Sequence, residues 1–191
     1  MSKLKKDNSL PKNARQVFKG KMFDVWQWKQ KMFDGTKETF ERIKRPDTVQ
    51  VIATVKDKIL IQEQEQPDRP PFISLPGGRR DEKENPVSAA QRELKEETGY
   101  ASNNWTLWKK YHPHSKIVWT IYTFIAKDCQ PESKPNLDSG EKIKNKLITF
   151  DEFLMLSENE LFYDKTMIIY LLKLRLYSKK KKEFCNFLFD K

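Results

Sequence analysis

The stretch from Gly77 to Tyr100, GGRRDEKENPVSAAQRELKEETGY, specifies one helix more sharply than any other segment of the chain. Asn85 is a favourable N-cap residue, and Pro86 suits the first helical position because its missing N–H would have no partner there. No helix breaker follows until Gly99, which can take the left-handed conformation that commonly ends a helix. We therefore predict a helix from Pro86 to Thr98.

Three glutamates fall on one face of this predicted helix. Glu93, Glu96 and Glu97 stand at i, i+3 and i+4, and successive helical residues turn by about 100°, so their side chains project together. Like charges at this spacing repel each other, whereas a divalent cation would reverse that cost, and Mg²⁺ prefers oxygen ligands. For the triplet alone, an ordinary acidic face exposed to solvent is the simpler interpretation.

The residues around the helix change that interpretation. Their spacing resembles the signature of the Nudix hydrolases, Gly-x5-Glu-x7-Arg-Glu-aliphatic-x-Glu-Glu-x-Gly-aliphatic. The fixed identities are matched at Gly78, Glu84, Arg92, Glu93, Glu96, Glu97 and Gly99. Leu94 fits the first aliphatic position, and Tyr100 departs from the second, which is a packing position. The resemblance implies an α+β Nudix fold, an α/β/α sandwich around a mixed β-sheet with an N-terminal antiparallel strand pair.

The resemblance also implies a metal site. The main-chain carbonyl of Gly77 and the carboxylates of Glu93, Glu96 and Glu97 would hold Mg²⁺ or Mn²⁺, and the glutamates would be catalytic, one of them helping to activate water. Family members hydrolyse a nucleoside diphosphate linked to another moiety. Water attacks phosphorus while the metal neutralises developing charge.

The other signature residues are expected to have structural roles. Gly78 allows the backbone to approach a metal or phosphate closely. Glu84 and Arg92 are an acid and a base that would pair and so fix the loop against the helix. Gly99 ends the helix. We expect none of these to act directly in catalysis.

Beyond the signature, roughly residues 20–175 resemble the ADP-ribose pyrophosphatase branch of the family. That branch places an antiparallel strand pair before the catalytic domain, as Lys21 to Ile43 would here, around the turn at Phe33-Asp34-Gly35. It often dimerises through this segment, so the resemblance implies a homodimer through the N-terminal strands, and a monomer that buries these strands internally is the alternative. Glu141, in a loop that resembles one of that branch, is the candidate for an additional catalytic acid or base, and an ordinary exposed loop glutamate is the alternative.

The branch implies a substrate, an ADP-ribose-like nucleoside diphosphate sugar hydrolysed to a nucleoside monophosphate and a sugar phosphate. It commonly carries Gln-Tyr-Arg before the signature, where this chain has Gln64-Glu65-Gln66. Arg69, Arg79 or Arg80 could supply the missing guanidinium, which suits phosphate recognition.

Two further sets of residues have competing interpretations. Trp26 and Trp28 could stack on a nucleobase, but core or dimer packing of a strand is the favoured alternative. His112 and His114 could suggest a metal site, but two histidines without further soft ligands favour a loop or turn.

We expect three segments along the chain. Residues 1–46 would form an N-terminal extension with the antiparallel strand pair, residues 47–178 the Nudix domain, and residues 179–191 a basic C-terminal tail. Within the Nudix domain, strands are predicted over 48–55, 58–62, 72–75, 117–126 and 147–150, and a C-terminal helix over 164–177.

The chain is basic, with 37 Lys and Arg against 27 Asp and Glu and a formal net charge of +10. The positive excess lies at both ends of the chain, which favours soluble flexible tails over a nucleic-acid footprint. Two alternative functions stay open: pyrophosphohydrolysis at an RNA 5′ end, and non-catalytic nucleotide binding by a Nudix regulator. The intact glutamate set argues against the regulator.

Composition excludes several other classes. Cys129 and Cys185 are the only cysteines and lack CxxC spacing, which argues against a disulfide scaffold and a structural zinc site. No stretch approaches the roughly 20 apolar residues of a membrane span. The basic first residues are followed by no apolar segment of the secretory type. We therefore expect a soluble, cytoplasmic protein with no membrane partner.

Overall fold

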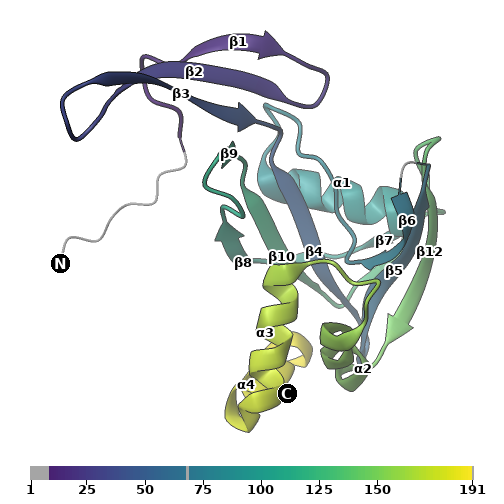
Figure 1. Cartoon of the computed structure of the whole chain (residues 1–191). Helices are drawn as coiled ribbons and strands as arrows, with labels where there is room; N and C mark the ends of the chain where they lie inside the picture. Colours follow the sequence, from purple (N-terminus) through teal and green to yellow (C-terminus); the bar gives the residue numbers. More distant parts are fainter. Residues whose placement is uncertain (1–8, 68, 191) are drawn as a thin grey trace.

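The computed structural model describes residues 9–67 and 69–190, and within them the chain forms three sheets and four α-helices (Figure 1). The strands are β1 (Arg15–Lys19), β2 (Asp24–Lys31), β3 (Lys37–Lys44), β4 (Thr48–Val55), β5 (Lys58–Gln66), β6 (Arg69–Ser74), β7 (Tyr100–Ala101), β8 (Asn104–Tyr111), β9 (Ile117–Val118), β10 (Ile121–Lys127), β11 (Gln130–Pro131) and β12 (Lys142–Ile148). The helices are α1 (Pro86–Thr98), α2 (Phe150–Met155), the 3-10 helix η1 (Leu156–Glu158), α3 (Lys165–Leu176) and α4 (Ser178–Phe189). None of the helices in these residues is long and apolar enough to span a membrane.

A mixed sheet forms the centre of the molecule. Its strand order is β12-β5-β4-β10-β8, and β6 pairs with β5. β10 runs parallel to β4, and the other pairs are antiparallel. β4 has the sequence TVQVIATV, rich in β-branched residues, and most of its side chains are buried, which suits a central strand. The predicted mixed sheet is confirmed.

Helices cover both faces of this sheet (Figure 1). On one face, α1 buries Ala89, Ala90 and Leu94 against apolar residues of β4 and β10. On the other face, α2, α3 and α4 surround a second apolar cluster that includes Phe153 and Leu171. The predicted α/β/α sandwich is therefore confirmed, and α1 is the helix that presents the glutamates.

Both ends of α1 lie at the predicted residues because both are capped. The Asn85 side chain accepts a hydrogen bond from the Val87 N–H at 3.0 Å. Gly99 has φ of 74°, and its N–H donates to the Lys95 carbonyl. A Cβ at Gly99 would overlap the carbonyl oxygen of Ser133, so space as well as conformation requires glycine there.

The predicted N-terminal strand pair is present and belongs to a larger sheet. β2 and β3 pair antiparallel, β1 adds to one edge and β9 to the other. In Figure 1 this sheet extends away from the central sandwich. Because β9 comes from the middle of the chain, it ties the N-terminal sheet to the rest of the molecule.

α4, Ser178–Phe189, takes up most of the segment that the sequence suggests as a basic tail. Phe184 and Leu188 are 5% and 1% exposed. The Phe184 ring lies 5.1 Å from that of Tyr170 and 5.4 Å from that of Trp108. The i, i+4 spacing of Phe184 and Leu188 gives the helix one apolar edge, so burial of that edge holds a segment that its lysine run alone would leave in solvent.

The single strand predicted over residues 117–126 is divided into β9 and β10. The break falls at Trp119 and Thr120, which donate hydrogen bonds to the first residue of β4 and to the residue before it. The Trp119 indole donates to Thr48 Oγ1, and the Thr120 N–H donates to Asp47 Oδ1, both at 2.9 Å. The break lets one stretch of chain join two different sheets.

Candidate active site

A cavity of about 530 Å³ beside α1 contains the glutamates that the sequence singles out. Its lining comes from α1, from the loop between β6 and α1, from the loop before β12 and from the turn between β1 and β2. The lining residues are Met22, Gly78, Arg79, Asp81, Arg92, Glu93, Glu96, Glu97, Asn136, Asp138 and Glu141. Four glutamates from two separate segments therefore share one cavity.

Arg92 fixes the loop against the helix. Its Nε and Nη2 donate to the two carboxylate oxygens of Glu84 at 3.1 and 3.0 Å, which is a bidentate ion pair. Nη2 also donates to the main-chain carbonyl of Arg79 at 3.1 Å. The hydrogen bonds from Arg92 lower the pKa of Glu84. The pairing expected of Glu84 and Arg92 is thus present.

Arg92 also holds Glu93 and Glu96. Its Nη1 donates to Glu93 Oε1 at 2.9 Å and to Glu96 Oε2 at 3.0 Å. The Glu93 side chain is only 13% exposed, and burial raises its pKa in spite of the guanidinium. A Cβ on Gly78 would lie 2.6 Å from Glu93 Oε2, so glycine leaves the room that this carboxylate occupies against the loop.

Glu97 is the most buried of the four glutamates, with 5% of the residue exposed. Its Oε2 accepts hydrogen bonds from the Gly77 N–H at 2.8 Å and from Gln62 Nε2 at 3.2 Å. Burial, reinforced by the charge of Glu93, raises the pKa of Glu97 to about 8. Gly77 has φ of 148°, and a Cβ there would overlap the Val49 carbonyl, so only glycine presents this N–H to the carboxylate.

Glu141 enters the same cavity from the loop before β12. Its N–H donates to the carbonyl of Asp138 at 3.0 Å, which closes a turn in this loop. Burial raises the pKa of Glu141, and the charges of Asp138 and Glu96 add to the effect. Glu141 is thus placed with the α1 glutamates although it lies more than 40 residues from them in the sequence.

The donor set fits a hard divalent cation. Glu93, Glu97 and Glu141 offer oxygen only, and burial disfavours their ionised forms, a cost that a bound cation would offset. Across residues 9–67 and 69–190, however, no group of three or more His, Cys, Asp or Glu side chains is gathered closely enough to hold a metal ion. Arg92 draws Glu93 toward Glu96, while Glu97 turns to Gly77. The expected ligands share the cavity without forming a closed cluster.

The three arginines suggested for phosphate binding lie in different places. Arg79 lines the carboxylate cavity. Arg80 pairs with Asp47 at 2.9 Å and lines an adjoining cavity. Arg69 lies over the Phe72 ring, 3.4 Å from its centroid, and does not line the carboxylate cavity. Of the three, only Arg79 is brought to the glutamates.

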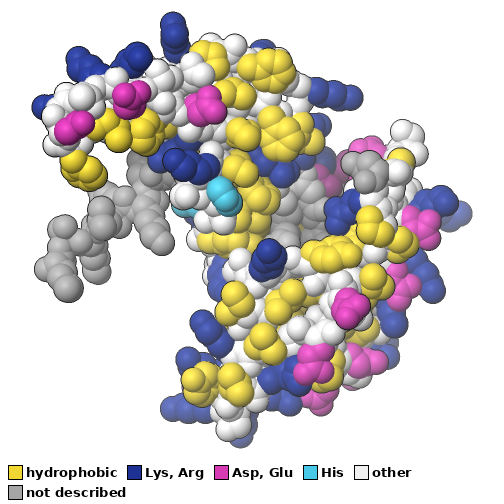
Figure 2. All heavy atoms as spheres, viewed as in Figure 1, with side chains coloured by type: hydrophobic (Ala, Val, Ile, Leu, Met, Phe, Trp, Pro, Cys, Tyr) yellow, Lys and Arg dark blue, Asp and Glu magenta, His cyan; other side chains and the backbone are white. Residues whose placement is uncertain are grey.

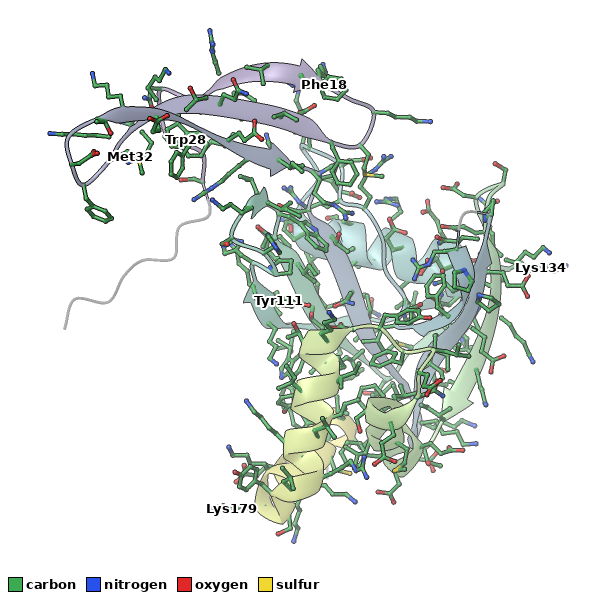
Figure 3. The ribbon with its side chains drawn as sticks, in the orientation of Figure 1. Phe18, Trp28, Met32, Tyr111, Lys134 and Lys179 are labelled. Carbon is green, nitrogen blue, oxygen red and sulfur yellow. The ribbon has the colours of Figure 1, made fainter. Side chains whose placement is uncertain are left out.

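Neither Trp26 nor Trp28 lines the cavity, because both belong to β2 of the N-terminal sheet; Figure 3 labels Trp28 there. Trp28 is 7% exposed, and its ring centroid lies 6.1 Å from that of Phe40. Strand packing therefore describes Trp28 better than stacking on a nucleobase.

The histidines and cysteines lie outside the cavity. His112 and His114 are exposed, and His112 Nδ1 lies 3.2 Å from the Trp119 carbonyl. Cys129 is fully buried, and burial raises the pKa of its thiol to about 12, which makes it inert. These observations agree with loop and packing roles.

Two residues that hydrogen-bond to the glutamates of α1 were not predicted from the sequence. Gln62 donates to Glu97, and the signal in the sequence is the series of glutamines at alternate positions in the second half of β5. Asn136 holds α1 from the loop before β12, because its N–H donates to the Glu96 carbonyl at 2.7 Å. No feature of the neighbouring sequence indicates this contact of Asn136.

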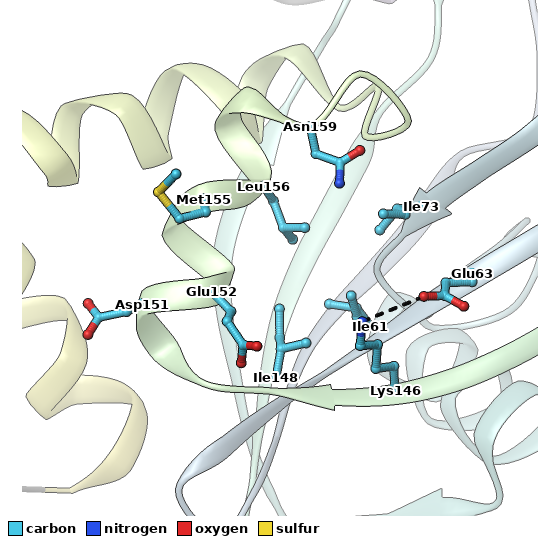
Figure 4. Close-up of a pocket in the computed structure, with 10 residues that line it drawn as sticks. All are labelled: Ile61, Glu63, Ile73, Lys146, Ile148, Asp151, Glu152, Met155, Leu156 and Asn159. Atoms are coloured by element: carbon cyan, nitrogen blue, oxygen red, sulfur yellow. Dashed lines mark ion pairs between the residues drawn. The ribbon is translucent and has the colours of Figure 1, made fainter.

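A cavity of about 390 Å³ lies on the opposite face of the central sheet, between α2 and the strands β5 and β12 (Figure 4). Ile61, Ile148 and Leu156 give it an apolar base. Glu63 at its rim pairs with Lys146 at 3.8 Å. Its three acidic residues have partners of their own: Glu63 pairs with Lys146, Asp151 pairs with Lys181 at 2.8 Å, and Glu152 accepts from the Thr149 N–H at 2.7 Å. The cavity beside α1, which is lined by four glutamates, is therefore the candidate active site.

Comparisons with known proteins show the family and the fold. The family model of the NUDIX domain matches residues 44–168. The ADP-ribose pyrophosphatase of Bacillus subtilis (strain 168) is 28% identical over 153 residues, covering 78% of this chain and 83% of that protein. The methanol dehydrogenase activator of Bacillus methanolicus is 28% identical over 181 residues, covering 92% and 96%. The crystal structure of an ADP compounds hydrolase matches with a TM-score of 0.71 and 24% identity, covering 88% of this chain and 93% of that one, which supports the fold.

Proposed function

Because the chain belongs to the Nudix family, we propose that it is a metal-dependent pyrophosphohydrolase acting on an ADP-ribose-like nucleoside diphosphate sugar. The products would be a nucleoside monophosphate and a sugar phosphate. One observation carries the proposal: Glu93, Glu96 and Glu97 share a single cavity with Glu141. The name of the Bacillus subtilis relative, ADP-ribose pyrophosphatase, supports this substrate class.

The carboxylates of Glu93, Glu96 and Glu97 and the carbonyl of Gly77 would hold Mg²⁺ or Mn²⁺. When bound, such an ion neutralises charge on phosphate oxygens and lowers the pKa of coordinated water. The protein contributes orientation. Arg92 bonds to Glu93 and Glu96, and the Gly77 N–H fixes one oxygen of Glu97.

Glu141 is the proposed acid–base group. Arg92 bonds to Glu84, Glu93 and Glu96, so Glu141 stands outside that network. Burial raises its pKa above the ordinary value, which is the direction that suits a carboxylate taking up a proton. A carboxylate oxygen of Glu141 would take the proton from the attacking water.

A neighbouring cavity offers room for the nucleoside end of the substrate. It measures about 270 Å³ and shares Met22 with the carboxylate cavity. Lys21, Lys44 and Arg45 contribute positive charge, and the Arg45 guanidinium lies 4.3 Å from the centroid of the Trp119 ring. Cations beside an aromatic ring suit a ligand that joins phosphates to a base.

The N-terminal sheet is the proposed homodimer interface. Val17, Phe18 and Phe23 are 44%, 58% and 45% exposed, and hydrophobic side chains gather over this sheet in Figure 2. Contiguous exposed apolar surface marks association sites. Light scattering after size exclusion would then give twice the chain mass of 22.8 kDa, and the mass of one chain would contradict this part of the proposal.

The substrate class is tested by phosphate-coupled turnover over a nucleotide panel with Mg²⁺ or Mn²⁺. The panel holds ADP-ribose, ADP-glucose, GDP-mannose, diadenosine polyphosphates, nucleoside triphosphates and triphosphorylated RNA, and alkaline phosphatase releases phosphate from monoester products only. We expect preference for a diphosphate sugar and no turnover with EDTA. Activity confined to RNA or triphosphates would contradict the substrate class and favour the alternative of an RNA 5′-end pyrophosphohydrolase.

A second candidate, a nucleotide-binding regulator, is favoured by one observation: a relative matching 92% of the chain is named a methanol dehydrogenase activator. The two candidates differ in their need for Glu97. An enzyme loses turnover in a Glu97→Gln variant, whereas a non-catalytic regulator keeps nucleotide binding and its effect on its partner. The complete set of glutamates in the cavity favours the enzyme.

A further inference from the structure

A row of glutamines on β5 leads to Glu97. Gln62, Gln64 and Gln66 stand at alternate positions and share the α1 side of the strand with Leu60, which belongs to the apolar cluster under α1. Gln62 is 0% exposed and Gln64 is 6% exposed. A buried amide costs free energy unless its donors and acceptor are paired, so the partners of these amides are informative.

The amides donate in one direction, toward Glu97. Gln66 Nε2 donates to Gln64 Oε1 at 3.4 Å, and Gln64 Nε2 donates to Gln62 Oε1 at 2.8 Å. Gln62 Nε2 then donates to Glu97 Oε2 at 3.2 Å. Ser74 on β6 supports this direction, because its Oγ accepts from Gln64 Nε2 at 2.8 Å and donates to Gln62 Oε1 at 3.4 Å. Amides aligned in this way polarise one another.

Glu97 is held by two other contacts. The Gly77 N–H donates to the same oxygen as Gln62, Oε2, so the other oxygen, Oε1, is left for a ligand. Asn145 on β12, the cross-strand partner of Gln62, donates to the Glu97 main-chain carbonyl at 3.0 Å. Neighbouring strands therefore fix both the backbone and the carboxylate of this residue.

We propose that Gln62 and Gln64 are positioning residues that orient the Glu97 carboxylate. Together with Gln66 at the outer end they form a chain of hydrogen-bonded amides, which we call the glutamine relay. Gln66 lines a small cavity of about 220 Å³ together with Glu141 and Gly140. The relay thus links the loop that carries Glu141 to the carboxylate on α1. It rests on the proposed function, because Glu97 matters to turnover only if it is a ligand or catalytic group.

The kinetic test compares Gln62→Met with Thr123→Val. Methionine keeps the length of glutamine and removes its hydrogen bonds. Thr123 is 1% exposed on β10, and its hydroxyl donates a hydrogen bond to Gln50. Thr123→Val is the matched control, because it removes one buried hydrogen bond at a position away from the glutamates. Outer partners of metal ligands typically contribute 10- to 100-fold in metal affinity or activity. We expect kcat to fall by about that factor in Gln62→Met, with KM changed less than twofold, and to stay unchanged in Thr123→Val.

A second readout needs neither metal nor substrate. The Gly77 backbone amide shares Oε2 of Glu97 with Gln62, so its ¹H–¹⁵N resonance reports the position of that carboxylate. In metal-free protein we expect this resonance and the Gln64 side-chain amide to shift in Gln62→Met and to stay in place in Thr123→Val. If Gln62→Met does not fold, Gln64→Met should shift the Gly77 resonance, and Gln66→Met should shift it less.

Together, kcat and the Gly77 resonance distinguish a failure of the proposed function from a failure of the relay. If the wild-type chain hydrolyses no nucleotide, the proposed function fails, and the Gly77 resonance still decides whether the relay positions Glu97. If turnover is normal but neither kcat nor the Gly77 resonance responds to Gln62→Met, the relay is overturned and the proposed function stands.

Discussion

The two faces of β5 are both buried, but one face packs apolar side chains and the other contacts the candidate active site. On the face toward α2, Ile59 and Ile61 are 0% and 2% exposed and stabilise the fold by leaving water. On the face toward α1, Gln62 is equally buried but contacts the carboxylate of Glu97, whose pKa burial raises to about 8. The two-residue period of one strand therefore separates a face that stabilises the fold from a face that holds the site and lowers stability.

The largest effect should come from the polar face. In Glu97→Gln, turnover should fall by at least about 100-fold, because a carboxylate oxygen that we propose to bind the metal is lost while the fold is retained. Glu160→Gln, an exposed change outside the cavity, is the matched control and should keep the wild-type rate. Steady-state kinetics and circular dichroism check both, and wild-type turnover in Glu97→Gln would contradict the assignment.

The apolar face should show the reverse pattern. Ile61→Ala should lower the free energy of unfolding by about 2–4 kcal/mol, since it leaves a cavity in a closely packed core. Its kcat should stay near wild type below the melting temperature. Ile169→Ala, at a residue that is 54% exposed, should change stability by less than about 0.5 kcal/mol. Urea denaturation measures both, and a large loss of kcat in Ile61→Ala would break the separation of the two faces.

In metal-free protein, the loss of stability caused by burying Glu97 should depend on pH. The pKa of Glu97 is about 8 in the folded state against an ordinary value of 4.5, so the folded state binds this proton more tightly. The stability that this group contributes is complete below pH 4.5 and is lost as pH rises toward 8. Glu97→Gln should therefore be increasingly more stable than wild type across this window, by up to a few kcal/mol. Thermal unfolding in EDTA measures the difference, and a difference that does not vary with pH would contradict it.

The smallest effect concerns one thiol on each side of the sheet. Cys129 is fully buried in the cluster under α1, with a pKa raised to about 12, whereas Cys185 on α4 is half-buried. At pH 8, iodoacetamide should modify Cys185 first and Cys129 only when the protein unfolds. Mass spectrometry of the alkylated protein reads this directly. Early modification of Cys129 would show that the α1 side opens more readily than its packing indicates.

Much of this architecture could be predicted where the signal is local. Asn85, Pro86 and Gly99 encode the ends of α1 in a few neighbouring residues, so its bounds agree with the sequence. β8 was not predicted, because its sequence NWTLWKKY mixes polar and aromatic residues and its strand conformation depends on pairing with β10. α4 was not predicted as a helix, because burial of Phe184 depends on Tyr170 and Trp108, which only the fold brings near.

The residues of the candidate site likewise fall into those that local sequence predicts and those that depend on the fold. Spacing alone could place Glu93, Glu96 and Glu97 on one face and suggest the pairing of Glu84 with Arg92. The position of Glu141 needed a resemblance, and the structure brings it to the cavity through the fold of a distant loop. Gln62 could not be assigned, because the partner of a buried amide is set by the packing of β5 against α1, 35 residues away in sequence.

We propose that the cavity beside α1 holds a divalent cation. Mn²⁺ binding, followed by electron paramagnetic resonance of the free ion, measures this without any substrate. We expect wild type and Glu160→Gln to bind Mn²⁺ with the same affinity, and Glu97→Gln to bind it at least about 10-fold more weakly. Equal Mn²⁺ affinity in all three proteins would contradict the account.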